Sequence, residues 1–218
     1  MRWTIRSLGL VMTIGIACGA APLAHAAGSA EAGATKAVVC QACHGPNGNS
    51  VNAQWPSLAG QNAAYIEAQL RQFHSKTRID PSGLMPPQVT ALTEQDIQDL
   101  AAYFSLQTPT GLEADPSYWQ AGEKLYRAGD PARQVPACTA CHGPVARGVP
   151  SAGYPQLRAQ HEEYVIQQLT SYAADNRYTR DGKGQSAGGP NDAIMHTIAS
   201  RLTPQDMRDL ASYVQGVR

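Results

Sequence analysis

The heptapeptide CQACHGP, from Cys40 to Pro46, returns almost unchanged as CTACHGP, from Cys138 to Pro144. Each copy separates two cysteines by two residues and places a histidine directly after the second cysteine. Cysteines with this spacing occur in zinc sites, in redox-active dithiols and where heme c is bonded to a protein. In an exported protein they also form disulfides. The surrounding sequence distinguishes between these four uses.

The rest of the chain repeats around these two motifs. Aligned on the cysteines, the two copies share four further landmarks in the same order: WPSLAGQ (55–61) with YPQLRAQ (154–160), YIEAQLRQF (65–73) with YVIQQLTSY (164–172), LTEQDIQDLAAY (92–103) with LTPQDMRDLASY (202–213), and Met85 with Met195, each 18 residues before a matched tyrosine. The copies differ mainly in segment 176–192, where the second copy has extra residues rich in glycine, and we expect a long loop there. The sequence is therefore a tandem duplication.

The spacing of apolar residues predicts an all-α protein. Helices are expected over 31–41, 62–74, 117–128 and 162–173, and no run alternates as a strand would. Each copy closes with an amphipathic helix whose apolar residues recur at i, i+3, i+4 and i+7: Ile97, Leu100, Ala101 and Phe104, then Met207, Leu210, Ala211 and Val214. Thr93 and Thr203 are the expected N-caps, and Pro204 suits a first helical position.

The duplication also sets the expected domain boundaries. Residues 1–26 combine a basic start, a short apolar run and an Ala24-x-Ala26 cleavage pattern, which predict a signal peptide and a periplasmic protein. Domain 1 then covers 27–107, a linker 108–116, and domain 2 117–218. The mature chain has 15 basic against 17 acidic residues, so we expect no nucleic-acid partner and no polybasic membrane patch. Peripheral membrane association stays open.

The histidines decide how the four cysteines of the mature chain are used. A redox dithiol should follow a strand of a βαβ unit, and no such unit is predicted. One zinc site made of all four cysteines would need a gap of 94 residues between the two pairs, well outside the usual spacing. Cys-x-x-Cys-His is the signature of heme c attachment, in which each thiol is bonded to the heme and the histidine binds the iron. We therefore predict two covalent hemes, held by Cys40, Cys43, Cys138 and Cys141, with His44 and His142 as axial ligands.

The methionines are the candidates for the sixth iron ligand, because a thioether favours ferrous iron and raises the reduction potential. Met85 and Met195 occupy matched positions before the closing helices, so we assign them to the first and second iron. The two prolines after Met85 predict a stiff loop there. Met207 lies on an apolar helix stripe and is predicted to be core. His196, directly after Met195, is the alternative ligand for the second iron; otherwise His74, His161 and His196 are expected on the surface or in loops.

Two prolines are candidates to orient the iron-binding histidines. Pro56 lies 12 residues after His44, and Pro155 lies 13 residues after His142. A proline carbonyl can accept the Nδ1 proton of a histidine, which leaves Nε2 for the metal. The neighbours Trp55, Leu58, Tyr154 and Leu157 are expected to pack on the hemes.

Each copy resembles a class I cytochrome c, with an N-terminal helix, Cys-x-x-Cys-His-Gly, a proline about a dozen residues on, a methionine and a closing helix. Two copies in one exported chain look like the diheme cytochrome c4 family, over essentially the whole mature chain. The resemblance implies two class I cytochrome c domains related by a pseudo-two-fold axis, with heme propionates near their interface. It also implies His/Met ligation of both irons. The extra residues before Met195 depart from the pattern.

The resemblance further implies a periplasmic electron carrier that takes electrons from a quinol-oxidising complex and delivers them to a terminal oxidase or another respiratory acceptor. No small-molecule substrate is expected, because no other catalytic motif is present. One alternative is the diheme cytochrome subunit of a dehydrogenase, such as a sulfide-oxidising flavocytochrome. A second is a diheme enzyme, such as a peroxidase or a thiosulfate dehydrogenase, which would need a displaceable sixth ligand.

Overall fold

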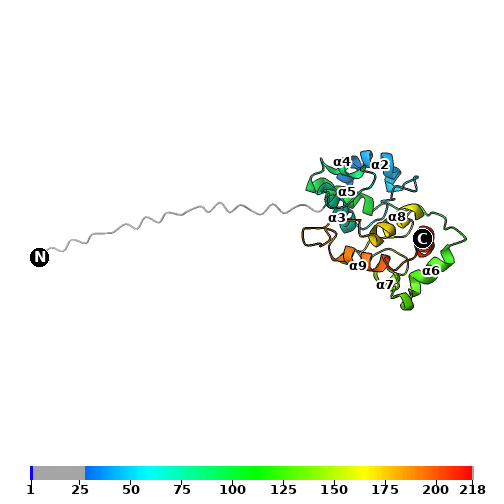
Figure 1. The fold of residues 1–218 in the computed structure, drawn as a ribbon. Helices are drawn as coiled ribbons and strands as arrows, with labels where there is room; N and C mark the ends of the chain where they lie inside the picture. Colours follow the sequence, from blue (N-terminus) through cyan, green and yellow to red (C-terminus); the bar gives the residue numbers. More distant parts are fainter. Residues whose placement is uncertain (2–27, 218) are drawn as a thin grey trace.

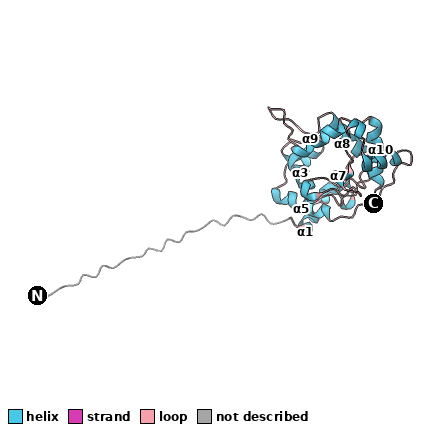
Figure 2. Cartoon of the chain, turned by 90° about the horizontal axis from the view of Figure 1, so that it is seen from below, coloured by secondary structure: helices cyan, strands magenta, loops and turns pink. Residues whose placement is uncertain are grey.

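The computed structural model describes Met1 and residues 28–217, so the expected signal peptide lies, apart from Met1, outside the described residues (Figure 1). The described part consists of helices joined by loops and contains no strand (Figure 2). Its α-helices are α1 (Ala30–Lys36), α2 (Val38–His44), α3 (Ala63–His74), α4 (Met85–Val89), α5 (Glu94–Ser105), α6 (Trp119–Ala128), α7 (Thr139–His142), α8 (Glu162–Ala173), α9 (Pro190–Ala199) and α10 (Pro204–Gly216). Short 3-10 helices are η1 (Pro46–Gly48), η2 (Pro131–Arg133) and η3 (Pro150–Ala152).

The helices form two halves, each with its own hydrophobic core. We call residues 28–107 the N-terminal half and residues 117–217 the C-terminal half. The first core is built around Ala37, Ile66, Leu100, Ala101 and Phe104. The second is built around Leu125, Tyr126, Val135, Ala146, Leu202, Met207, Leu210, Tyr213 and Val214. Both predicted apolar stripes of the closing helices are therefore confirmed as core, and so is the packing role of Met207. No helix in residues 28–217 is long and apolar enough to cross a membrane.

A glycine lets the first helix of each half cross the closing helix at close range. A Cβ atom on Gly33 of α1 would lie 2.0 Å from the carbonyl oxygen of Asp99 in α5. A Cβ atom on Gly122 of α6 would lie 1.9 Å from the carbonyl oxygen of Asp209 in α10. Any larger residue would force the two helices apart, since real Cβ contacts are never this short. The same crossing is thus built twice.

The closing helices begin as the sequence predicts. The Thr93 side chain accepts from the backbone N–H of Asp96, and the Asp96 side chain accepts from the N–H of Thr93, which forms a capping box. Thr203 and Asp206 make the same reciprocal pair at the start of α10, where Pro204 is the first residue. These bonds satisfy backbone donors that the first helical turn leaves without partners.

Three predicted boundaries are corrected. The expected helix over 31–41 is two helices, because the N–H of Cys40 bonds to the Ala37 carbonyl three residues back and tightens the chain between α1 and α2. The helix expected from residue 117 starts at Trp119, after a turn. Met85 does not lie in a stiff loop: it opens the short helix α4, since prolines fit the first turn of a helix.

The glycine-rich segment 176–192 is also only partly the predicted loop. Its last three residues belong to α9, which contains Met195. Its first residues are buried against the N-terminal half: the Ile79 N–H donates to the Arg177 carbonyl at 2.9 Å, and the Thr179 N–H donates to the Thr77 carbonyl at 2.8 Å. These partners come from the other copy, so the local composition of the segment gave no sign of them.

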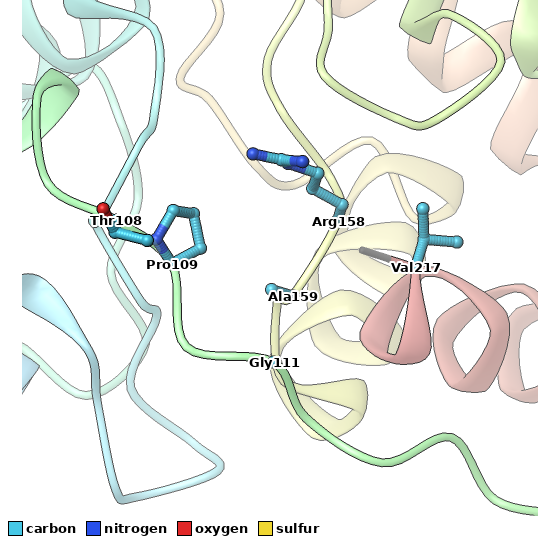
Figure 3. Close-up of a pocket in the computed structure, with 6 residues that line it drawn as sticks. All are labelled: Thr108, Pro109, Gly111, Arg158, Ala159 and Val217. Atoms are coloured by element: carbon cyan, nitrogen blue, oxygen red, sulfur yellow. The ribbon is translucent and has the colours of Figure 1, made fainter.

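The linker is fixed to both halves. Asn49 donates through Nδ2 to the Thr108 carbonyl at 3.1 Å, and its Oδ1 accepts from the Thr110 N–H at 2.7 Å. At the other end, the Asp115 N–H donates to Ser212 Oγ at 2.8 Å. Between these ends, Thr108, Pro109 and Gly111 line a cavity of about 300 Å³ together with Arg158, Ala159 and Val217 (Figure 3). No residue of either Cys-x-x-Cys-His motif lines it.

Candidate heme sites

The first motif occupies the end of α2. Cys40, Cys43 and His44 lie in this helix, which ends at Gly45 with a φ of 75°, a value that favours glycine. His44 is buried, and its Nδ1 lies 2.8 Å from the Pro56 carbonyl oxygen. Because a carbonyl only accepts, Nδ1 donates, and Nε2 keeps its lone pair. Burial lowers the pKa of His44 more than the bond to Pro56 raises it, so the imidazole is neutral and suited to bind a metal.

The second motif repeats this geometry on the shorter helix α7. Cys138 is the N-cap of α7, and Gly143 ends the helix with a φ of 79°. His142 is as buried as its counterpart, and its Nδ1 donates to the Pro155 carbonyl oxygen at 3.0 Å. Burial again lowers the pKa of this histidine. The ring of Tyr154 lies 6.2 Å from the His142 ring. Both predicted histidine–proline hydrogen bonds are therefore present.

The four cysteines are free thiols in the structure, and none forms a disulfide. Burial raises the pKa of the Cys138 thiol to about 11 and also raises the pKa of Cys40. Cys40 and Cys138 pack against the two hydrophobic cores, whereas Cys43 is exposed. Among residues 28–217 there is no group of three or more His, Cys, Asp or Glu side chains placed to hold a metal ion.

The two candidate methionines are half-buried and held in different ways. The Met85 N–H donates to Asp80 Oδ2 at 2.8 Å, and the other carboxylate oxygen accepts from the Ser82 N–H at 3.1 Å. Burial raises the pKa of Asp80, but the hydrogen bonds lower it by more than burial raises it. The net effect is a lowered pKa, so the carboxyl is ionised at neutral pH. Met195 instead lies within α9. Among the described residues, no carboxylate accepts from the Met195 N–H as Asp80 accepts from that of Met85.

The three other histidines in the described part of the chain differ from one another in their surroundings. His74 is exposed, as expected, near the end of α3. His161 lies in a loop, as expected, directly before α8, but it is buried, and its Nε2 bonds to the Ser50 carbonyl of the other half at 2.8 Å. His196 is not in a loop: it lies within α9 and is half-buried, with Nδ1 donating to the Tyr172 carbonyl at 2.8 Å. The burial of His161 has the same cause as that of segment 176–192, because its partner lies in the other copy.

Two buried arginines that the sequence analysis missed meet between the halves. Arg78 stacks on Phe73 of its own half and donates to Tyr164 Oη of the other at 2.9 Å. Arg177 stacks on Tyr172 of its own half and donates to Tyr65 Oη of the other at 3.0 Å. The signal was present in the alignment, since Arg78 follows α3 at the position where Arg177 follows α8.

These arginines lack the anion that buried charges require. Arg177 is 3% exposed, and its Nε and Nη1 find no hydrogen-bond partner in the described part of the chain. No carboxylate there forms an ion pair with Arg78 or Arg177. Burial raises the pKa of the Tyr164 hydroxyl, but the charges of the two arginines outweigh this and lower it. The interface is thus a positively charged site with free N–H donors.

Comparison with known proteins identifies the family. The family model described as cytochrome c matches residues 30–106 and 119–218. Cytochrome c4 from Azotobacter vinelandii is 42% identical over 215 residues, which cover 95% of this chain and 96% of that protein. The chain belongs to the cytochrome c4 family. The crystal structure of reduced recombinant cytochrome c4 from Pseudomonas stutzeri matches with a TM-score of 0.78 at 39% identity, covering 88% of this chain and all of that one. A protein named thiosulfate dehydrogenase electron acceptor, from Thiomonas intermedia, is 33% identical over 96% of this chain and 90% of its own length.

As a cytochrome c4, the protein has two cytochrome c domains, carries two covalently bound heme c groups and transfers electrons. Its residues fit this cofactor. Each half offers two free thiols beside a buried, neutral histidine whose Nε2 is available. The unpartnered guanidinium nitrogens of Arg177 fit the carboxylates that heme carries. Heme carboxylates would therefore be suitable partners for buried groups that the described part of the polypeptide leaves unsatisfied.

Proposed function

We propose that this cytochrome c4 is a periplasmic electron carrier that passes electrons from a quinol-oxidising complex to a terminal oxidase or another respiratory acceptor. The observation that carries the proposal is the matched pair of buried histidines, each hydrogen-bonded through Nδ1 to a proline carbonyl. An electron carrier needs a redox site that rearranges little on oxidation and reduction, and each half offers one. In this proposal residues 1–26 are removed on export, and domains 27–107 and 117–218 each hold one heme.

The proposal gives each site residue one role. Cys40 and Cys43 bond the first heme and Cys138 and Cys141 the second; His44 and Met85 bind the first iron, His142 and Met195 the second, and Pro56 and Pro155 orient the histidines. When bound, each heme supplies a one-electron change of its iron. A neutral imidazole and a soft thioether would both bind each iron, which would favour ferrous iron and leave no position for a substrate. Because neither iron would have an open position for a substrate, we propose that the protein is a carrier and not an enzyme.

Arg78 and Arg177 are the proposed partners of the heme propionates. Two buried positive charges in one interface are costly unless anions neutralise them. A guanidinium with free N–H groups binds a carboxylate through more than one hydrogen bond. Support comes from the two nitrogens of Arg177 that are buried without a partner.

The two ends of the molecule differ in net charge, so a charged partner should bind preferentially at one of them. Residues 27–113 hold 4 basic and 7 acidic side chains, whereas residues 114–218 hold 11 and 10. Propionates make both halves more negative, yet the difference between them persists. A partner with a positive surface should therefore approach the N-terminal half faster, and added salt should slow the encounter.

A second candidate function is acceptance of electrons from a dehydrogenase of sulfur compounds. The relative from Thiomonas intermedia, named thiosulfate dehydrogenase electron acceptor, favours it. Donor identity separates the two candidates, because both use the same heme sites.

Purified protein tests the proposal in two steps. The chromophore should stay with the polypeptide in acidic acetone, because thioether bonds hold it; release into the solvent would contradict covalent attachment. The oxidised protein should then be reduced rapidly by a quinol-oxidising complex supplied with quinol, and reoxidised by a terminal oxidase. Reduction only by a dehydrogenase of sulfur compounds would favour the second candidate. Turnover of peroxide or thiosulfate by the protein alone would make it an enzyme.

A further inference from the structure

Two glutamines bridge the halves in a reciprocal way. The Gln61 side chain accepts from the Gln156 N–H at 2.8 Å and donates to the Gln156 carbonyl at 2.9 Å. The Gln160 side chain accepts from the Ser57 N–H at 2.9 Å and donates to the Ser57 carbonyl at 2.9 Å. Each glutamine therefore holds both backbone polar groups of one residue in the other half.

Both glutamines are buried and fixed. Gln61 and Gln160 are each 8% exposed. Their Oε1 atoms also accept from the N–H of the next residue, Asn62 at 3.0 Å and His161 at 3.1 Å. The orientation of each amide is unambiguous, because a backbone N–H only donates and a carbonyl only accepts. Loss of the Gln61 side chain would leave the N–H and carbonyl of the buried residue Gln156 without these partners, and loss of Gln160 would do the same for the half-buried residue Ser57.

The residues that the glutamines hold directly follow the two prolines. The Ser57 N–H and the Pro56 carbonyl belong to one planar peptide group, as do the Gln156 N–H and the Pro155 carbonyl. In the first peptide group the carbonyl accepts from His44 Nδ1 and the N–H donates to Gln160 Oε1. A continuous hydrogen-bond chain thus runs from the histidine of one half to the glutamine of the other. The mirror chain runs from His142 through the Pro155 peptide group to Gln61.

Hydrogen bonds in such a chain strengthen one another. An acceptor on the N–H of a peptide group polarises it, so that its carbonyl oxygen becomes a better acceptor. A stronger acceptor at Nδ1 makes the imidazole a more basic metal ligand, which stabilises ferric over ferrous iron. The side chain at the far end of the chain therefore acts on the potential of an iron in the opposite half.

We propose that Gln160 and Gln61 are positioning residues that tune the reduction potentials crosswise: Gln160 acts on the heme of the N-terminal half, and Gln61 on the heme of the C-terminal half. This inference rests on the proposed axial roles of His44 and His142. In this inference the interface does more than hold the halves together, because each half supplies the glutamine that ends the hydrogen-bond chain of the other half's heme site.

The test is a redox titration of the heme-loaded Gln160→Ala and Gln61→Ala variants. The two potentials are assigned to the two hemes with Met85→His and Met195→His, each of which should change the spectrum and potential of one heme. Gln160→Met and Gln61→Met serve as second variants, since they keep the side-chain volume without the hydrogen bonds. Thermal unfolding checks that every variant is folded.

The expected pattern is crossed. Gln160→Ala and Gln160→Met raise the potential of the N-terminal heme and leave the other near its wild-type value, and the Gln61 variants do the reverse. Equal shifts of both hemes, shifts confined to the heme in the variant's own half, or no shift would overturn the inference. The proposed ligation of the two irons by Met85 and Met195 fails separately, and recognisably, if Met85→His and Met195→His leave both hemes unchanged.

Discussion

The two halves of the molecule keep their histidine sites nearly identical and build their methionine segments differently. The histidine-to-proline hydrogen bonds measure 2.8 Å and 3.0 Å, and both helix crossings bring a glycine against a carbonyl of the closing helix. Met85, in contrast, opens a short helix under a hydrogen bond from its N–H to Asp80, whereas Met195 lies inside α9. The duplication has therefore preserved the segment with the Cys-x-x-Cys-His motif and varied the segment that we propose supplies the sixth ligand.

The closing helices show the same division on a smaller scale. Asp96 and Asp206 occupy the same place in the two capping boxes. The cation beside them differs: Lys36 of α1 lies 2.7 Å from Asp96, and Arg133 of η2 lies 2.5 Å from Asp206. Backbone-defining interactions are thus retained, while the charges that assist them come from different elements.

Substitutions at the two helix crossings should have the largest effect on stability. Gly33→Ala and Gly122→Ala should each destabilise the protein by about 3 kcal/mol, because the new Cβ overlaps a backbone carbonyl that cannot move alone. Unfolding in denaturant measures the loss. Gly182→Ala is the matched control, since no atom lies within 4 Å of its Cβ position. If both glycine variants behave like the control, neither helix crossing is as tight as the structure indicates.

Asp80 marks the difference between the two methionine segments. Asp80→Ala should destabilise the Met85 segment by about 1 kcal/mol, because the Met85 and Ser82 N–H groups lose a charged acceptor. The weak red absorption band of ferric iron bound to thioether should then weaken for one heme only on mild heating. Asp181→Ala is the control, because its carboxylate also accepts from nearby N–H groups but lies far in sequence from Met195. Equal effects of the two variants would remove the distinction.

The capping boxes should respond alike in both halves. Thr93→Ala and Thr203→Ala should each cost about 1 kcal/mol of stability, as expected for loss of an N-cap side chain. Thr197→Ala, on the exposed face of α9, should stay within about 0.5 kcal/mol of the wild type. Chemical denaturation of the three variants compares them. A large difference between the two cap variants would show that the halves do not share this device.

Acid should weaken the same two caps. The side-chain bond from Lys36 holds the pKa of Asp96 at about 2, and that from Arg133 holds the pKa of Asp206 at about 2, both below the usual 3.8. A depressed folded-state pKa stabilises the protein above the unfolded-state value, and this contribution is lost as the pH falls from about 4 towards 2. Denaturation at several pH values should show this loss, and Asp96→Asn and Asp206→Asn should each reduce it. An unchanged pH dependence in both variants would contradict the assignment.

The sequence predicted what lies within one copy and missed what lies between the copies. The caps at Thr93 and Thr203 and the bonds to Pro56 and Pro155 depend on residues a short distance apart in the chain, so spacing revealed them. The burial of His161 and Arg177 depends on partners more than a hundred residues away, Ser50 and Tyr65. Periodicity carries no information about such contacts. Comparison of matched positions, such as Gln61 with Gln160, is the signal that could have indicated them.

We propose that each half binds its iron through one histidine and one methionine. The most direct measurement is the red thioether band of the fully oxidised protein, measured per heme in the wild type and in the Met85→Ala and Met195→Ala variants. The wild type should show a band from both hemes, and each variant should lose half of its intensity. A full-strength band in the Met195→Ala variant, or no band in the wild type, would contradict it.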